Sequence, residues 1–122
     1  MQRFTDLKVW QRSHALVLTI YRATARFPPD ERFGITSQLR RAAVSVPSNI
    51  AEGSKRQGRR DYARFLNIAE GSLGETQYLL MLARDLGHLP QDVAAPLLDE
   101  ADEIARVLHT LRVKVEPGDD AP

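Results

Sequence analysis

Apolar residues recur every three or four positions along most of the chain, which is the spacing of one face of an α-helix. Four such stretches predict helices at about 7–26, 36–55, 59–86 and 90–115. Pro28-Pro29, Gly58 and the segment from Gly87 to Pro90 separate them, and these residue types end or begin helices. Short connections favour antiparallel neighbours. The pattern therefore predicts an all-α, antiparallel up-down four-helix bundle over residues 1–115, followed by a flexible tail at 116–122.

The first three helices carry more apolar and small residues than one small bundle needs. The first has a broad apolar face that includes Trp10, His14 and Tyr21, and we expect His14 to be a core or interface residue. The second has a face of small residues at Val44, Pro47 and Ala51. In the third, Gly71 and Gly74 each cost roughly 1 kcal/mol relative to alanine, which predicts a packing reason for them. This surplus indicates burial between subunits.

A row of polar side chains lies along the edge of the apolar stripe of the second helix and continues on the third. Its members are Gln38, Ser45, Asn49, Glu52, Ser72 and Glu75. A ligand-binding or catalytic pocket is one interpretation, and a hydrogen-bond network that fixes helix register or a subunit interface is the other. We favour the network, because Asn49 and Glu52 can bond backbone groups exposed near Pro47, which has no N–H to donate.

Composition places the chain among ordinary globular proteins. It has 122 residues, a net charge of +1 and no cysteine, which fits one domain in a reducing cytoplasm. No apolar run approaches the ~18 residues of a membrane span, and the N-terminal segment does not resemble a signal peptide. The charge is unevenly distributed, with a net of +8 over residues 1–64 and −7 over residues 65–122. A basic face for nucleic acid and electrostatic matching between helices or subunits both explain this asymmetry.

The candidate basic cluster contains Arg40, Arg41, Lys55, Arg56, Arg59, Arg60 and Arg64. Cations of this kind neutralise phosphates and bind RNA or DNA in a salt-dependent, sequence-tolerant way. In the alternative interpretation, Arg40 and Arg41 pair with carboxylates such as Glu52 or Glu70, and the other cations only keep a turn solvated. The turn from Lys55 to Arg64 is the better candidate for binding, with Tyr62 as the one aromatic residue beside it.

Enzymatic motifs are lacking in the sequence. There is no Gly-rich phosphate loop and no serine in a nucleophile elbow. A di-iron bundle needs Glu-x-x-His pairs on two helices, and the nearest approach is a single Asp85-x-x-His88. We therefore expect a protein that is not an enzyme and has no metal site and no cofactor.

Four segments resemble the bacterial four-helix bundle family often called the 23S rRNA intervening-sequence protein family. They are DLKVWQRSHALVLTIYRAT, FPPDERFGITSQLRRAAVSVPSNIAEG, DYARFLNIAEGSLGET and LLMLARDLGHL. The resemblance runs from about Phe4 to Leu111. It implies a homopentameric ring of bundles around a central channel. A related branch, the accessory variability determinant of diversity-generating retroelements, binds nucleic acid and a reverse transcriptase.

Two functions follow as hypotheses. The first is a cytoplasmic, non-enzymatic scaffold or adaptor whose main partner is itself, as a pentamer. The alternative is an accessory ring that binds RNA or DNA electrostatically and assists a nucleic-acid enzyme such as a reverse transcriptase. The basic turn discriminates between them, because reversing its charge should abolish nucleic-acid binding and leave the assembly intact.

Overall fold

The computed structural model describes residues 3–118, and the last four residues of the predicted tail lie outside this range. Its elements are a 3₁₀ turn η1 (Phe4–Asp6), helix α1 (Lys8–Thr24), a 3₁₀ turn η2 (Pro29–Glu31) and helices α2 (Ile35–Ser54), α3 (Arg59–Asp85) and α4 (Gln91–Val115). Four long helices and no strand are present in the described part of the chain, which confirms the all-α prediction. The largest difference from the predicted bounds is at α1, which ends at Thr24 instead of residue 26.

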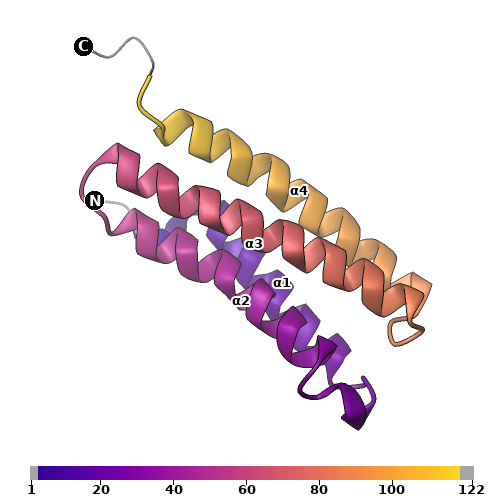
Figure 1. Ribbon diagram of the computed structural model, residues 1–122. Helices are drawn as coiled ribbons and strands as arrows, with labels where there is room; N and C mark the ends of the chain where they lie inside the picture. Colours follow the sequence, from indigo (N-terminus) through magenta and orange to yellow (C-terminus); the bar gives the residue numbers. More distant parts are fainter. Residues whose placement is uncertain (1–2, 119–122) are drawn as a thin grey trace.

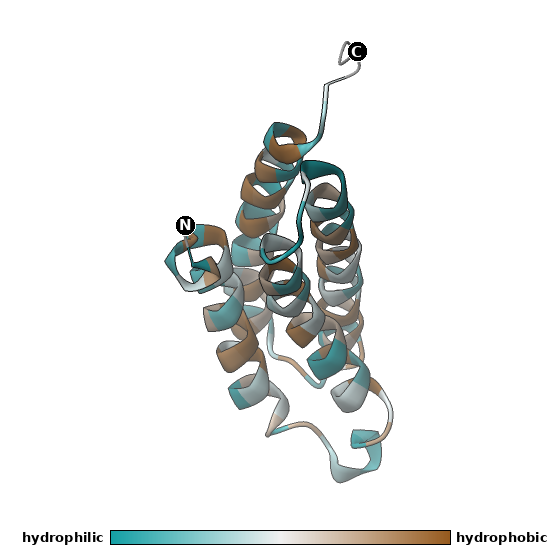
Figure 2. Cartoon of the chain, turned by 90° about the vertical axis from the view of Figure 1, so that its left-hand side faces the viewer, coloured by the Kyte–Doolittle hydropathy of each residue, from teal (hydrophilic) through white to brown (hydrophobic). Residues whose placement is uncertain are grey.

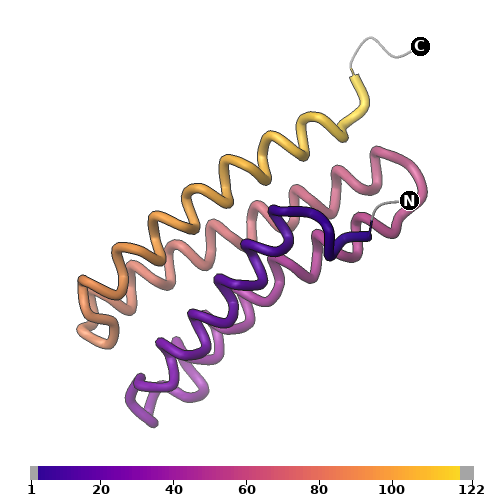
Figure 3. The backbone as a smooth tube through the Cα atoms, turned by 180° about the vertical axis from the view of Figure 1, so that it is seen from behind, coloured from indigo at the N-terminus to yellow at the C-terminus, as the bar shows by residue number. Residues whose placement is uncertain are grey.

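The helices pack as a bundle in which each contacts its neighbours in the chain and α1 also contacts α4. Consecutive helices run in opposite directions, as Figure 1 shows. Seen from behind, η1, the α2–α3 turn and the end of α4 gather at one end of the bundle, while the α1–α2 and α3–α4 connections lie at the other (Figure 3). The two ends therefore carry different sets of candidate residues.

The core consists of the inward-facing aliphatic residues of all four helices, and Figure 2 shows the brown, hydrophobic positions concentrated on the facing sides. The largest fully buried aliphatic residues are Ile20, Leu39, Ile50, Leu66, Leu73, Leu80, Ile104 and Leu108. Burial of each such side chain contributes roughly 1.5–3 kcal/mol before entropy is counted. This core accounts for the helical spacing in the sequence.

Helices α2 and α3 share the most extensive contact, and small residues explain why. At Gly53 an added Cβ would lie 2.7 Å from the Cβ of Phe65 and 3.1 Å from Cδ1 of Tyr62, so only glycine permits this approach. Ala42, Ala43 and Ala69 are also buried in the core. Pro47 is buried inside α2, which continues through it as a helix.

Both tight helix connections depend on glycine. Gly58 precedes α3 with φ 91°, and Gly87 follows α3 with φ 82°. Side chains other than glycine rarely adopt these positive angles, so the two glycines fix where α3 begins and ends. At the Gly87 end, Phe27 is buried and His88 bonds Glu31 at 2.9 Å, which ties the α1–α2 connection to the α3–α4 connection.

Candidate functional site

The predicted basic cluster is divided between two places. Arg40 and Arg41 lie in the second turn of α2, whereas the cations from Lys55 to Arg64 surround the α2–α3 turn. A helix rises about 1.5 Å per residue, so Arg40 and Lys55 are roughly 22 Å apart along the axis. The seven residues thus do not form one surface.

Two arginines of the turn are engaged with carboxylates. Arg56 bonds Glu52 at 2.9 Å and lies 3.9 Å from Asp61, and Arg64 bonds Asp61 at 3.0 Å. Both guanidinium groups also lie over the ring of Phe65, at 4.7 and 4.6 Å from its centroid. Their charge is partly compensated inside the turn, which weakens the attraction of these two guanidinium groups for a phosphate.

A third arginine of the turn forms hydrogen bonds to the end of α4. Arg59 donates to the carbonyl oxygens of Lys114 and Val115, at 2.6 and 2.9 Å. A cation is favourable at a helix C-terminus, where carbonyl groups lack helical partners. Of the five cations between Lys55 and Arg64, only Lys55 and Arg60 make no ion pair or side-chain hydrogen bond within residues 3–118.

Arg40 has polar partners but no carboxylate. Its Nε donates to Thr24 Oγ1 at 2.8 Å, its Nη2 donates to the Tyr21 carbonyl oxygen at 3.3 Å, and its guanidinium lies 4.5 Å from the Tyr21 ring centroid. Arg41 and Arg32 likewise form no ion pair in the described chain. Sequence reasoning did not single out Arg32, because its segment was treated only as a connector.

Three of the six members of the polar row are linked by hydrogen bonds. Ser45 and Ser72 share a hydrogen bond of 2.8 Å between their hydroxyl groups, and the Asn49 amide donates to the carbonyl oxygen and the hydroxyl of Ser45, at 2.8 and 2.9 Å. Thr76 extends the row by donating to the Ser72 carbonyl at 2.8 Å. Of these bonds, Ser45–Ser72 connects α2 to α3, and the others lie within one helix.

The other three members of the row are outside this network. Glu52 turns to Arg56, and within residues 3–118 no hydrogen bond involves the side chain of Gln38 or Glu75. The geometry of Ser45, Asn49 and Ser72 satisfies polar groups at a helix interface and brings no base close to a nucleophile. That this network fixes the register of α2 against α3 stays a prediction.

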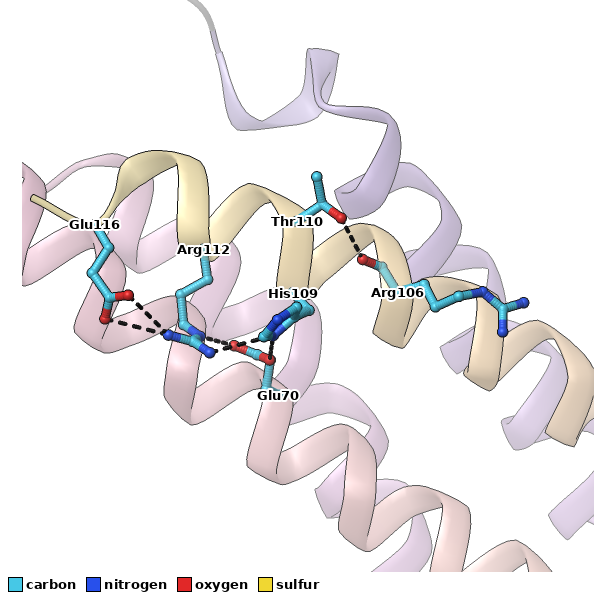
Figure 4. Close-up of polar contacts among 6 residues, drawn as sticks. All are labelled: Glu70, Arg106, His109, Thr110, Arg112 and Glu116. Carbon is cyan, nitrogen blue, oxygen red and sulfur yellow. Dashed lines mark hydrogen bonds and ion pairs between the residues drawn. The ribbon is translucent and has the colours of Figure 1, made fainter. Parts of the chain in front are cut away.

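A charged cluster that sequence reasoning missed ties α4 to α3 (Figure 4). Glu70 of α3 accepts from Arg112 and bonds His109 Nδ1 at 3.1 Å, and Arg112 also bonds Glu116. The hydrogen bond to Glu70 raises the pKa of Arg112 above its usual value. Three or four residues separate the bonded partners on α4, so a search for i, i+3 and i, i+4 charges would have found His109, Arg112 and Glu116 but not Glu70.

The outer face of α3 is mixed, and the two glycines lie on it among exposed Arg64, Asn67 and Glu75. Within residues 3–118, an added Cβ at Gly71 or Gly74 would meet no atom within 4 Å. Ile68, Tyr78 and Met81 are exposed on the same helix. The packing reason predicted for the two glycines is therefore absent among the described residues.

A second unpartnered surface lies between α1 and α2. Trp10 stacks on His14, with ring centroids 5.2 Å apart, and Phe4 contacts Trp10 edge-on at 5.1 Å. These rings, with Pro47 and Ala51, line a groove of about 370 Å³. His14 is exposed in the chain, so the core position expected for it is not observed and the interface alternative stays a prediction.

Within residues 3–118, histidine, aspartate and glutamate do not gather in any group of three or more that could hold a metal ion. Over the same range, no helix combines the length and apolar character needed to cross a membrane. Asp85 bonds Arg84 at 2.9 Å, and His88 bonds Glu31.

Comparison with known proteins supports the fold and the family. A crystal structure of a protein of unknown function from the S23 ribosomal protein family of Bacteroides thetaiotaomicron is 24% identical to this chain. The superposition of the two chains has a TM-score of 0.77 and covers 85% of this chain and 97% of the Bacteroides chain. That likeness establishes the fold. No curated protein matches the chain. The family model described as 23S rRNA-intervening sequence protein matches residues 5–110, and the chain therefore belongs to this family.

Proposed function

We propose that the protein is a non-enzymatic scaffold or adaptor that assembles with copies of itself, as a ring of five bundles. The observation that carries the proposal is the outer face of α3. Glycine in an exposed helix interior costs roughly 1 kcal/mol relative to alanine, and among residues 3–118 Gly71 and Gly74 have no neighbour that needs the space. A partner helix that approaches closely supplies the missing reason.

The groove between α1 and α2 supports a head-to-tail contact. It presents the stacked rings of Trp10 and His14, and it lies on other helices than the Gly71 face. Two different faces that pair between copies form a heterologous interface, which closes into a ring when the rotation permits. The number five is what the resemblance to the family implies.

Native mass spectrometry tests this proposal directly. The full chain should give a single assembly of five copies, and a bulky substitution, Gly74→Leu, should reduce it to monomers. Thr110→Leu adds a bulky side chain on the exposed side of α4 and is the matched control. A wild-type monomer at micromolar concentration contradicts the assembly.

A second candidate function is electrostatic binding of RNA or DNA by the ring. It is favoured by the weak neutralisation of the basic half of the chain. Arg12–Glu100, at 2.8 Å, is the one arginine–carboxylate pair between residues 3–64 and 65–118. Lys55 and Arg60 keep their charge free at the α2–α3 turn, and a ring repeats them around its axis, which multiplies weak contacts.

A shift assay with single-stranded RNA over a salt series tests this candidate. Lys55→Glu with Arg60→Glu should abolish the shift at low salt and leave the native mass unchanged. This pair is a cleaner choice than Arg59 with Arg60, because Arg59 also holds the end of α4. Binding that does not weaken with salt, or that survives both substitutions, contradicts the electrostatic mechanism.

A further inference from the structure

A cavity of about 420 Å³ lies where the later turns of α1, the end of the α1–α2 connection and the first turns of α2 meet. It is at the end of the bundle opposite the α2–α3 turn. Its lining combines three arginines, two aromatic rings and the side chains of Thr36 and Ser37. The scaffold function does not use it, and of its lining residues only Arg40 and Arg41 belong to the basic cluster.

The charge of this cavity is positive and uncompensated. Arg32, Arg40 and Arg41 line it, no carboxylate does, and none of the three forms an ion pair within residues 3–118. Glu31, the neighbouring acid on η2, bonds His88 at 2.9 Å. By contrast, Arg12, Arg56, Arg64, Arg84, Arg106 and Arg112 each have a carboxylate partner. Three guanidinium groups without a carboxylate partner surround one cavity, although Arg40 already donates to Thr24 and Tyr21. Such a group of cations fits a phosphate, which accepts paired N–H donors.

Thr36 is a second, independent indication of a ligand. It lines the cavity and is only 8% exposed, yet its Oγ1 is a buried polar atom without a hydrogen-bond partner. Buried hydroxyl groups are nearly always bonded, because an unbonded one loses its water without compensation. A shift of the neighbouring side chains on binding would let a phosphate oxygen accept the hydrogen bond that this hydroxyl lacks in the free protein, where its oxygen is buried.

The start of α2 adds to the same field. No side chain caps this helix, and the first backbone N–H with a partner is that of Gln38, which donates to the Gly34 carbonyl at 3.0 Å. The preceding N–H groups, from Ile35 to Ser37, have no carbonyl partner in the described chain. Free N–H groups and the positive end of the helix dipole favour an anion at this position.

The aromatic residues indicate more than a simple anion. Phe33 is 88% exposed, and the Arg32 guanidinium lies 5.3 Å from its ring centroid. Tyr21 is also exposed at the cavity, with the Arg40 guanidinium over its ring. An exposed phenylalanine beside unpaired arginines provides a stacking surface for a base next to donors for its phosphate, the combination used for single-stranded nucleic acid.

We propose that this cavity binds one nucleotide unit, with its phosphate on Arg40, Arg41 and Thr36 and its base on Phe33. The cavity volume is within the range of small-molecule sites. The unit can be a free mononucleotide or the end of a strand, which share the phosphate and the base. The site is formed within one chain and does not depend on the ring, so it goes beyond the scaffold function.

Calorimetric titration of the full chain at low salt tests the site, with adenosine monophosphate, inorganic phosphate and a short oligoadenylate as ligands. Adenosine monophosphate should bind once per chain and at least about tenfold more tightly than inorganic phosphate, which lacks the base. Comparable affinity for the mononucleotide and for an oligoadenylate with a terminal phosphate identifies the terminal unit as what is bound. Tighter binding of the longer strand alone overturns the single-unit site.

Three variants locate the binding. Arg41→Gln should weaken adenosine monophosphate about tenfold or more, because a hydrogen-bonded charge is lost. Phe33→Ala should reduce its affinity to that of inorganic phosphate. Lys8→Gln, at the start of α1, removes one positive charge at the opposite end of the bundle and should leave binding unchanged. Equal losses in Arg41→Gln and Lys8→Gln overturn the site in favour of diffuse attraction.

Thr36→Val separates a binding role from a structural one. The substitution keeps the shape and removes the unbonded hydroxyl, so the melting temperature of the free protein should stay the same or rise. Binding of adenosine monophosphate should nevertheless weaken severalfold. A lower melting temperature with unchanged affinity overturns the role of Thr36, and absence of any saturable binding at low salt overturns the proposal.

Discussion

Replacing Gly71 and Gly74 together by alanine asks whether the outer face of α3 is free or covered. Both residues lie inside a long helix, and the added methyl groups meet no atom of the chain within 4 Å. In an isolated bundle each substitution removes the helix penalty of glycine, so the pair should stabilise the fold by about 2 kcal/mol. For a domain of this size that gain raises the melting temperature by roughly 6–10 °C.

The same double variant behaves differently if α3 packs on a second copy. A close helix–helix approach over two glycines leaves no room for two methyl groups, and overpacking of this kind costs typically 1–3 kcal/mol. The assembly should therefore dissociate at higher protein concentration than the wild type, while the separated monomers are more stable than wild-type monomers. Native mass spectrometry over a dilution series measures the first effect, and thermal unfolding of dilute protein measures the second.

Gly53→Ala is the matched control, since Gly53 is a helical glycine that is covered by its own chain. Its new Cβ would lie 2.7 Å from the Cβ of Phe65, so this variant should lose stability despite the better helix propensity of alanine. If the Gly71 and Gly74 variant gains stability and keeps the wild-type mass at every dilution, no copy covers this face and the assembly reasoning is wrong.

Three further predictions concern the interior and the charged contacts. Asn49→Ala removes two hydrogen bonds to Ser45 and should lower the free energy of unfolding by about 1 kcal/mol; an unchanged melting curve would show that these bonds contribute nothing. Burial raises the pKa of Tyr62, so its contribution to stability is complete below the pKa of about 10 of an unfolded tyrosine and is lost as the pH rises through the higher folded value. Above pH 10 the free energy of unfolding, measured with denaturant, should therefore fall less with pH in Tyr62→Phe than in the wild type. Parallel pH curves for the two proteins would contradict this. Glu70→Gln should speed amide hydrogen exchange in the last turns of α4. Glu103→Gln, which removes an ion pair between two residues of α4, should leave these exchange rates unchanged. Equal exchange rates in the two variants would rule out Glu70 as the residue that holds α4 to α3.

The candidate sites show how far spacing alone can lead. Ser45, Asn49 and Glu52 share one edge of α2, and helical periodicity places them there without any structure. Two of their contacts, Asn49 with Ser45 and Glu52 with Arg56, span four residues and follow from the same periodicity. The Ser45–Ser72 bond depends on the opposite helix, and spacing along α2 alone does not predict it.

The same limit applies to the arginines. A run of basic residues predicts positive charge, but Glu52 and Asp61, each within one helical turn, pair with Arg56 and Arg64, and only the 3.9 Å approach of Arg56 to Asp61 depends on the turn at Gly58. Arg32 and Phe33 showed no periodic signal, because they belong to the connection between α1 and α2. Their place beside Arg40 results from how that connection folds back over the helix ends.

The sequence by itself determined the four helices, their order and their inward faces, because helix periodicity, prolines and glycines act within a few residues of the chain. It also indicated that α3 carries glycines for a reason other than helix formation. Only the tertiary structure decided that this reason is absent inside the chain, that the basic residues fall at two ends of the bundle, and that Thr36 is buried without a partner. These outcomes depend on distances between segments far apart in the sequence, which local physical preferences do not fix.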